Sequence, residues 1–161
     1  MKTKFQQRLC AGLRFFLLSG LLTSCACQKG EVSNIQLELA DFTSDGCSLF
    51  IDGTFEKPEL WKECCLLHDM AYWRGGTEEE REQADLSFKA CVEKKTGDPV
   101  LANLMYEAVR VGGEPYFPTW YRWGYGWPIG RGYKALTPEE EKLAEQKLEV
   151  FLRIQGKEHA K

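Results

Sequence analysis

The stretch that decides the fold is "ECCLLHDMAYWRGG", residues 63–76. Two adjacent cysteines stand three and four residues before His68, and an aspartate follows the histidine directly. Because proline suits a first helical turn and a pair of glycines stops a helix, we predict a helix from Pro58 or Glu59 to about Trp73. Its buried stripe is predicted to hold Trp61, Cys65, His68 and Tyr72, with Leu60, Cys64 and Leu67 beside it.

Three further helices are expected, over residues 77–97, 99–111 and 137–161. The first of these opens with a capping box formed by Thr77 and Glu80, and the short link before it implies antiparallel packing on the preceding helix. Its apolar stripe is Ala84, Phe88, Cys91 and Val92, and that of the last helix is Leu143, Leu148, Phe151 and Leu152. These patterns predict a mostly α domain with an antiparallel helix pair.

An aromatic-rich loop is expected at residues 114–133, between the third helix and the last. It holds too much glycine and proline for a long helix, and too many aromatic residues for a disordered linker. Its rings would form a membrane-interface patch or a lid, or would simply cover the small helical core. We favour the covering role.

The chain begins with the layout of an export signal, "MKTKFQQRLCAGLRFFLLSGLLTSC". Its start is basic, and its apolar run is too short for a permanent membrane span. The ending "LTSC" resembles the lipobox of bacterial lipoproteins, which implies a lipid on Cys25; an ordinary signal peptide cut nearby is the alternative. We predict a signal peptide at residues 1–24, a lipidated tether at 25–40 and the helical domain at 41–161. The protein is then exported and membrane-anchored, at the bacterial outer membrane or in the periplasm.

Charge and cysteine content narrow the classes of function. The chain has 21 basic and 24 acidic residues, and the predicted signal peptide holds four basic and no acidic ones. The remainder therefore carries a net charge of −7, which argues against a nucleic-acid partner. Four cysteines form an even set for two disulfides in an exported protein: Cys47, Cys64, Cys65 and Cys91. Zinc is disfavoured, because the only other histidine is His159 in the polar C-terminal tail.

A disulfide between Cys64 and Cys91 would bring His68 level with Asp85. His68 lies about 6 Å along the axis from Cys64, and Asp85 about 9 Å from Cys91, in the same direction for antiparallel helices. Asp85 would then hydrogen-bond one imidazole nitrogen and leave the other free. The alternative is that Asp85 points outward and pairs with Lys89. We favour the first arrangement, because Asp85 lies beside the buried stripe, where an unpartnered carboxylate is costly.

Asp69 lies about 100° around the helix from His68, so it would not orient the imidazole. It could instead hold a cation near the free nitrogen of the ring. If Cys47 were bonded to Cys65, the "SDGCS" loop would face Asp69 and offer backbone carbonyls and the Asp45 side chain. These are the hard oxygen ligands that Ca²⁺ prefers.

The residues discussed so far resemble a known family. "CCLLHDMAY" is similar to the CCxxHDxCY signature of the secreted phospholipase A2 superfamily, and "TSDGCS" resembles the calcium loop of its short bacterial members. The resemblance covers about residues 41–92. It implies that His68 is the general base, that Asp85 orients it, and that Tyr72 hydrogen-bonds Asp85.

The same resemblance implies a calcium site, with Asp69, Asp45 and the carbonyl of Gly46 as ligands. It also implies the helix-to-helix disulfide between Cys64 and Cys91. The implied function is calcium-dependent hydrolysis of carboxylic esters in phospholipids or other acyl-ester lipids, at the bacterial envelope.

The chain also departs from the family pattern. Ala71 stands where the family has a cysteine, "SLFID" replaces a run of glycines in the calcium loop, and residues 114–133 and the last helix have no counterpart. The altered loop favours a second hypothesis, a lipoprotein of the same fold that binds an envelope lipid or partner without turnover. A purely structural lipoprotein is the third, and it predicts no calcium affinity.

Overall fold

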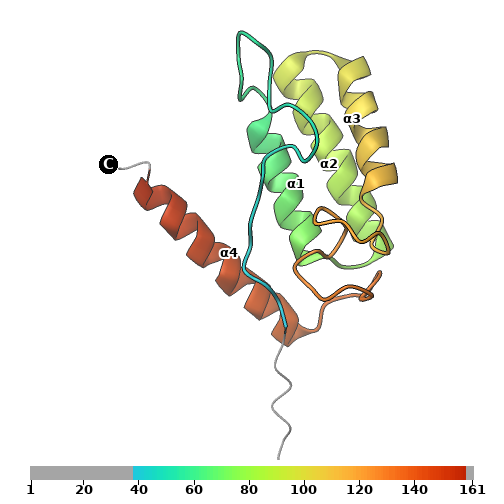
Figure 1. The fold of residues 1–161 in the computed structure, drawn as a ribbon, viewed down its shortest axis with the longest axis vertical. Coiled ribbons are helices and arrows are strands. Elements are labelled where there is room, and N and C mark those ends of the chain that lie inside the picture. Colours follow the sequence, from blue (N-terminus) through green and yellow to red (C-terminus); the bar gives the residue numbers. More distant parts are fainter. Residues whose placement is uncertain (1–37, 159–161) are drawn as a thin grey trace, which may run out of the picture. The chain divides into compact units, whose positions relative to one another are not determined.

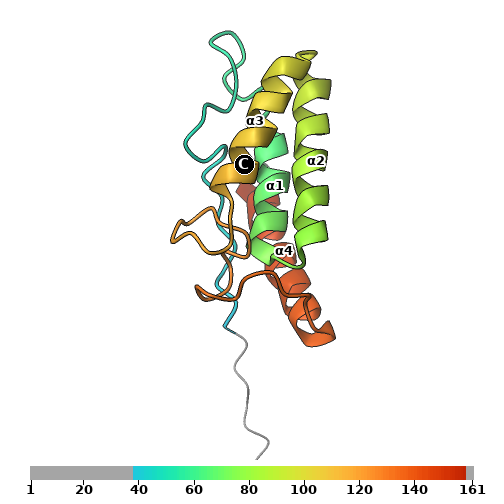
Figure 2. The same cartoon turned by 90° about the vertical axis from the view of Figure 1, so that its right-hand side faces the viewer.

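Residues 38–158 are described by a computed structural model, and they are mostly helical. The helices are α1 (Lys62–Arg74), α2 (Glu78–Thr96), α3 (Pro99–Gly112) and α4 (Pro138–Glu158), and no strand occurs within this range. α1, α2 and α3 lie alongside one another in both views (Figure 1, Figure 2). The prediction of a mostly α domain is therefore confirmed.

Several features predicted at the N-terminus fall outside the described part of the chain. They are the signal peptide at residues 1–24, the lipidation site Cys25, and residues 26–37 of the tether. Between residues 38 and 158, no helix has both the length and the apolar character that crossing a membrane requires.

Both disulfides are formed, Cys47 with Cys65 and Cys64 with Cys91. The first ties the loop before α1 to the first turn of α1, and the second ties α1 to α2. Around them lies an apolar cluster, the disulfide core, made of Cys47, Trp61, Cys64, Cys65, Phe88, Val92, Ala102 and Met105. The two crosslinks and this core hold the helices that carry His68 and Asp85.

α1 begins at Lys62, so the prediction of a start at Pro58 or Glu59 was wrong. The backbone N–H of Trp61 donates to the carbonyl of Asp52 at 3.0 Å, and its indole N–H donates to the carbonyl of Ile51 at 2.7 Å. These contacts with the preceding loop hold Trp61 at the N-cap and leave the residues before it in turns. The contacts of Trp61 with the preceding loop thus set the start of α1, and Pro58 does not.

α1 is buried on two faces, whereas the sequence predicted one. Its second face packs into the aromatic core, a cluster of Leu39, Phe42, Trp73, Trp127 and Ala144. Leu66 and Met70 of α1 pack against this cluster, and Leu67, which was expected to be buried, is 56% exposed. Leu39 belongs to the predicted tether, so the packed structure begins before Asp41.

The predicted starts of the three later helices are observed. Thr77 and Glu80 form a reciprocal capping box at α2, and Asp98 caps α3 by accepting from two backbone N–H groups. Thr137 and Glu140 make the same reciprocal pair of hydrogen bonds at the start of α4. Leu143, Leu148 and Phe151 of α4 pack against the aromatic core, but Leu152 is exposed, contrary to the prediction.

The aromatic segment, residues 114–133, folds against the C-terminal end of α1. The last carbonyls of a helix lack partners within the helix. Here the carbonyls of Tyr72, Trp73 and Arg74 accept hydrogen bonds from Gly124 N, Gly126 N and Trp127 Nε1, respectively. The carbonyl of Gly76, just beyond the helix, accepts from Trp123 Nε1. Trp123 and Trp127 are buried and cover the core as expected, whereas Trp120 is 62% exposed.

Candidate active site

His68 on α1 and Asp85 on α2 face each other in the interior. Nε2 of His68 lies 2.8 Å from Oδ1 of Asp85, the histidine is 8% exposed, and the aspartate is fully buried. The alternative that Asp85 pairs with Lys89 is wrong, because Lys89 donates to Asn103 instead. The structure therefore brings His68 and Asp85 together, as predicted from the packing of two antiparallel helices.

Asp85 accepts more hydrogen bonds than the sequence predicted. The hydroxyl of Tyr72 donates to Oδ1 at 2.8 Å, as expected from the resemblance, and Nη1 of Arg110 donates to Oδ2 at 2.7 Å. Although burial alone would raise the pKa of Asp85, hydrogen bonds from His68 and Arg110 hold it below its ordinary value. Asp85 is thus a carboxylate at neutral pH and can stabilise a positive charge on His68.

Arg81 is a second arginine that sequence reasoning missed. It lies on α2, four residues before Asp85, and its side chain is fully buried. Nε donates to the Tyr72 hydroxyl at 3.2 Å, and the guanidinium also donates to Glu114, to the Tyr133 hydroxyl and to the carbonyls of Val109 and Arg110. Arg81 therefore joins α2 to the end of α3 and to the aromatic segment, with Tyr72 at the centre.

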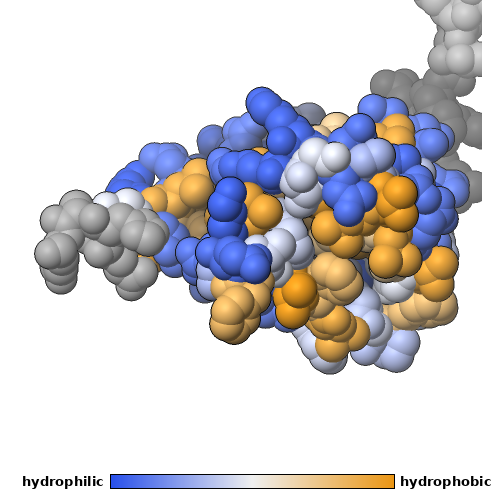
Figure 3. Space-filling model, turned by 90° about the horizontal axis from the view of Figure 1, so that it is seen from above, coloured by the Kyte–Doolittle hydropathy of each residue, from blue (hydrophilic) through white to orange (hydrophobic). Residues whose placement is uncertain are grey.

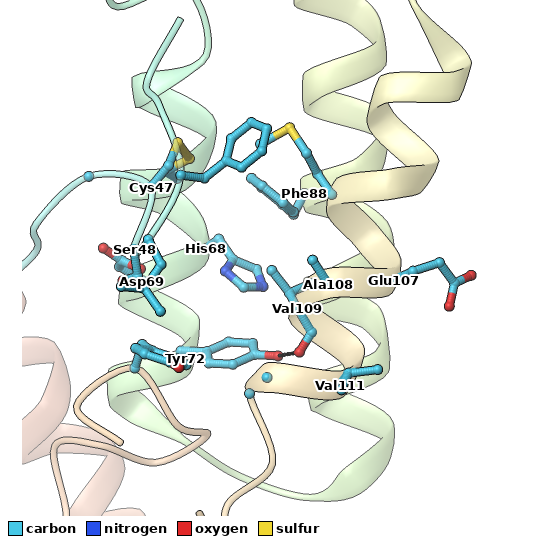
Figure 4. Close-up of a pocket in the computed structure, with 18 of the residues that line it drawn as sticks. Cys47, Ser48, His68, Asp69, Tyr72, Phe88, Glu107, Ala108, Val109 and Val111 are labelled. Atoms are coloured by element: carbon cyan, nitrogen blue, oxygen red, sulfur yellow. Dashed lines mark hydrogen bonds between the residues drawn. A yellow bond between two sulfur atoms is a disulfide. The ribbon is translucent and has the colours of Figure 1, made fainter.

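The imidazole of His68 is held between two aromatic rings. Its centroid lies 4.2 Å from that of Tyr72 and 4.7 Å from that of Phe88. Figure 4 shows the ring between these two side chains, with Ser48 and Asp69 on one side and α3 on the other. Nε2 is engaged by Asp85, and Nδ1 has no hydrogen-bond partner among residues 38–158. The ring is thus fixed in place with one nitrogen available.

A cavity of about 570 Å³ opens beside His68 and Asp69. Its wall is mostly apolar and includes Leu49, Phe50, Phe88, Leu104, Met105 and Val109. The loop before α1, together with α1, α2 and α3, contributes to it (Figure 4). A cavity of this size and character suits an acyl chain or another apolar ligand.

Asp69 is a nearly buried carboxyl group, 8% exposed, that lines this cavity. Burial raises its pKa to about 7, against the hydrogen bond that its Oδ2 accepts from Ser44 Oγ at 2.6 Å, and the nearby carboxylates of Asp45 and Asp52 raise it further. Within residues 38–158, none of the three acids forms an ion pair with a lysine or arginine. A bound cation would relieve this accumulation of negative charge.

The loop before α1 holds the other predicted ligands near Asp69. Asp45 is exposed, and its carboxylate accepts from Ser48 Oγ at 2.7 Å and from Trp120 Nε1 at 3.2 Å. Gly46 has a φ of +80°, and a Cβ there would lie 2.5 Å from Asp52 Oδ1. Asp52 itself accepts from Cys47 N at 2.8 Å and so supports the loop. Ser44, Asp52 and Trp120 were not predicted.

The donor chemistry around Asp69 fits Ca²⁺. Asp69, Asp45 and the carbonyl of Gly46 offer oxygen atoms only, the ligands of a hard cation. In the described range, the one group of three potential side-chain ligand atoms that lie together belongs to Cys47, Asp52 and Cys65. That group is not a metal site, because its two sulfurs form a disulfide. A calcium ion would therefore be held by no more than two of these carboxylates, those of Asp69 and Asp45, together with backbone carbonyls and water.

Comparisons of the chain with protein-family models, with curated proteins and with solved structures found no match.

Proposed function

We propose that this protein is a calcium-dependent, phospholipase A2-like hydrolase that cleaves carboxylic esters of phospholipids, anchored at the bacterial envelope through Cys25. One observation carries the proposal. A buried hydrogen bond of 2.8 Å joins His68 to Asp85 beside an apolar cavity of about 570 Å³, and Asp69 lies on the same wall. This combination offers a base, a group that orients it, and space for an acyl chain.

His68 acts as the general base. Its free nitrogen accepts a proton from a water molecule as the oxygen attacks the acyl carbon, and the imidazolium then donates that proton to the leaving alcohol oxygen. Asp85 accepts from the other nitrogen and stabilises the imidazolium. Burial and the neighbouring Asp85 carboxylate raise the pKa of Tyr72, so its hydroxyl stays protonated and keeps donating to Asp85.

Calcium would be held by Asp69, Asp45 and the carbonyl of Gly46. When bound, it would polarise the ester carbonyl and offset the negative charge that develops on the carbonyl oxygen. The residues of this chain contribute the rest: Asp69 supplies a carboxyl group that is already shielded from water, and Ser44 fixes its orientation.

Exposed apolar side chains surround the cavity and suit a lipid substrate. Leu49, Phe50, Leu104 and Val111 line the cavity and are between 46% and 77% exposed. Apolar side chains also gather in patches on the face seen in Figure 3. Exposed apolar groups next to an apolar cavity favour contact with a lipid surface, from which an acyl chain can enter.

The proposal is tested with vesicles of mixed phospholipids, by measuring fatty acid and lysolipid release with calcium and with a chelator. We expect release with calcium, its loss in chelator, and its return when calcium is added back. Asp69→Asn should abolish the response to calcium, whereas Glu82→Gln, on an exposed position of α2, should not. Release that continues in chelator would contradict a calcium requirement.

A binding protein without turnover is the second candidate. Both carboxylate oxygens of Asp45 already accept hydrogen bonds, and Leu49 adopts a positive φ of 60° in the loop. These two features favour a loop that departs from the catalytic geometry of the family that the sequence resembles. Calcium binding without hydrolysis of any ester would select this candidate.

A further inference from the structure

A second cavity, of about 560 Å³, adjoins the first. Ser48, Asp69 and Tyr121 line both cavities. The second differs from the first in chemistry, because carboxylates, hydroxyl groups and aromatic rings make up most of its lining, with only Ala40, Pro118 and Ile129 as aliphatic residues. The carboxylates are Asp41, Asp45 and Asp69, and the rings are Trp73, Trp120, Tyr121 and Tyr125.

The aromatic side chains of this cavity are held in place. The indole N–H of Trp120 donates to Asp45, its ring packs edge-on against Tyr121 with centroids 5.2 Å apart, and the Tyr125 hydroxyl donates to the carbonyl of Thr43 at 2.7 Å. Trp120 is 62% exposed and is nevertheless fixed by these contacts. Rings that are held beside carboxylates form a preorganised site for an organic cation.

The side chains that line this cavity favour a ligand that carries both a phosphate and an ammonium group. Arg122 is the only basic residue among those that line the cavity, and its guanidinium donates to the backbone carbonyls of Trp127 and Thr119 and to no carboxylate within residues 38–158. A phosphate group would therefore find one buried positive charge. An ammonium group attached to that phosphate would find the faces of the aromatic rings and the edge of Asp41, whose carboxylate is paired with Lys147.

We propose that the second cavity is a head-group subsite that selects phospholipids whose head group ends in an ammonium, ethanolamine or choline, over anionic ones. This inference rests on the proposed function, which puts the reacting ester at His68 and Asp69 and the acyl chain in the first cavity. The head group, on the other side of the ester, then lies toward the second cavity. Calcium would engage Asp45 and Asp69, and Lys147 pairs with Asp41. The selectivity therefore comes from the aromatic ring faces, which attract an ammonium group and not an anionic one.

Binding is tested first, and separately from catalysis. In the His68→Gln protein, calorimetric titration with phosphoethanolamine and with phosphocholine should show tighter binding than titration with glycerol phosphate. Trp120→Ala in the same background should weaken binding of the amines by about threefold to thirtyfold, whereas Trp120→Phe should restore most of it. Phe55→Ala is the matched control, because Phe55 is 98% exposed and lines neither cavity. Equal binding of amine and anionic compounds, or no effect of Trp120→Ala, would overturn the subsite.

Selectivity is tested with wild-type protein on vesicles that contain ethanolamine and glycerol head groups in equal amounts, with identical acyl chains. Mass spectrometry of the two lysolipids should show an excess of the ethanolamine product, and Trp120→Ala should bring the ratio close to one. Equal release of both by the wild type would overturn the subsite while leaving the proposed hydrolysis intact. Amine binding without release of either product would instead overturn the hydrolysis and leave the subsite in a binding protein.

Discussion

Asp85 is the residue on which the candidate site depends. His68 and Tyr72 share one of its carboxylate oxygens, and Arg110 occupies the other at 2.7 Å. When a buried carboxylate pairs with both an arginine and a histidine, the positive charge of the arginine weakens the stabilisation that the carboxylate gives to the protonated histidine. Arg110 therefore sets how strongly Asp85 can favour the protonated imidazole, although Arg110 itself does not contact His68 through any hydrogen bond.

Arg110→Gln should shift the pH dependence of ester hydrolysis. Without the guanidinium, the charge of Asp85 favours the imidazolium more strongly, so the acidic limb of the rate profile should move to higher pH by roughly half a unit. The measurement is the rate of fatty acid release between pH 5 and pH 9. Arg153→Gln, on an exposed part of α4, serves as the control. A profile that keeps its midpoint while only the maximum rate falls would show that Arg110 does not act through Asp85.

At the scale of elements, the end of α3 and the aromatic segment hold Tyr72 in place. A Cβ on Gly113, the C-cap of α3, would lie 2.4 Å from Cε1 of Tyr72 and 2.5 Å from its hydroxyl oxygen. The φ of Gly113 is −87°, which any residue can adopt. The absence of a side chain at this position therefore serves the close approach to Tyr72 and not the backbone conformation.

Gly113→Ala should displace Tyr72 from Asp85 and lower both activity and stability, the latter by about 1–3 kcal/mol as in other overpacked sites. The neighbouring Gly112→Ala is the matched control. Its Cβ would meet only Cε2 of Tyr121, at an ordinary 3.6 Å. Chemical denaturation and hydrolysis rates of the two variants check the prediction. Indistinguishable variants would mean that Tyr72 has room to move without consequence.

Local signals predicted the elements better than they predicted their contacts. The capping box of Thr77 and Glu80 was predictable because both partners lie within one helical turn. The pairing of His68 with Asp85 followed from helix geometry once a disulfide was assumed. Arg110 could not be predicted in the same way, because it lies 25 residues from Asp85 and reaches it only through the packing of α3.

The second buried face of α1 was missed for a similar reason. Leu66, Met70 and Trp73 follow helical spacing, but their burial depends on partners at both ends of the domain, Leu39 and Phe42 on one side and α4 on the other. The sequence predicted that the loop before α1 lies near Asp69 but not which residues support it. Asp52 and Ser44 hold it through contacts that have no local sequence signature.

At the scale of the whole molecule, an ion pair anchors the start of α4. Arg131 donates to both carboxylate oxygens of Glu140, at 2.9 Å and 2.8 Å, and packs over the Trp127 ring at 4.1 Å. Hydrogen bonds from Arg131 lower the pKa of Glu140 to about 2, although burial opposes the shift. The pair thus links α4 to the aromatic core.

Glu140→Gln should change how stability depends on pH. A carboxyl group with a lowered pKa in the folded state contributes stability above its ordinary pKa of 4.5, and this contribution is lost as the pH falls toward 2. The variant should therefore be less stable than the wild type at pH 7, and the difference should shrink between about pH 5 and pH 2. Denaturant titrations across this range check it, with the exposed Glu139→Gln as control. A difference that stays constant with pH would contradict the assignment.

The most direct test of the account compares wild type with His68→Gln in fatty acid release from calcium-containing phospholipid vesicles. Glutamine can still hydrogen-bond Asp85 but cannot accept a proton from water, so the fold should persist while the base is lost. We expect the rate to fall by about a hundredfold or more, with an unchanged midpoint of thermal unfolding. Equal turnover by the two proteins would contradict the assignment of His68 as the base.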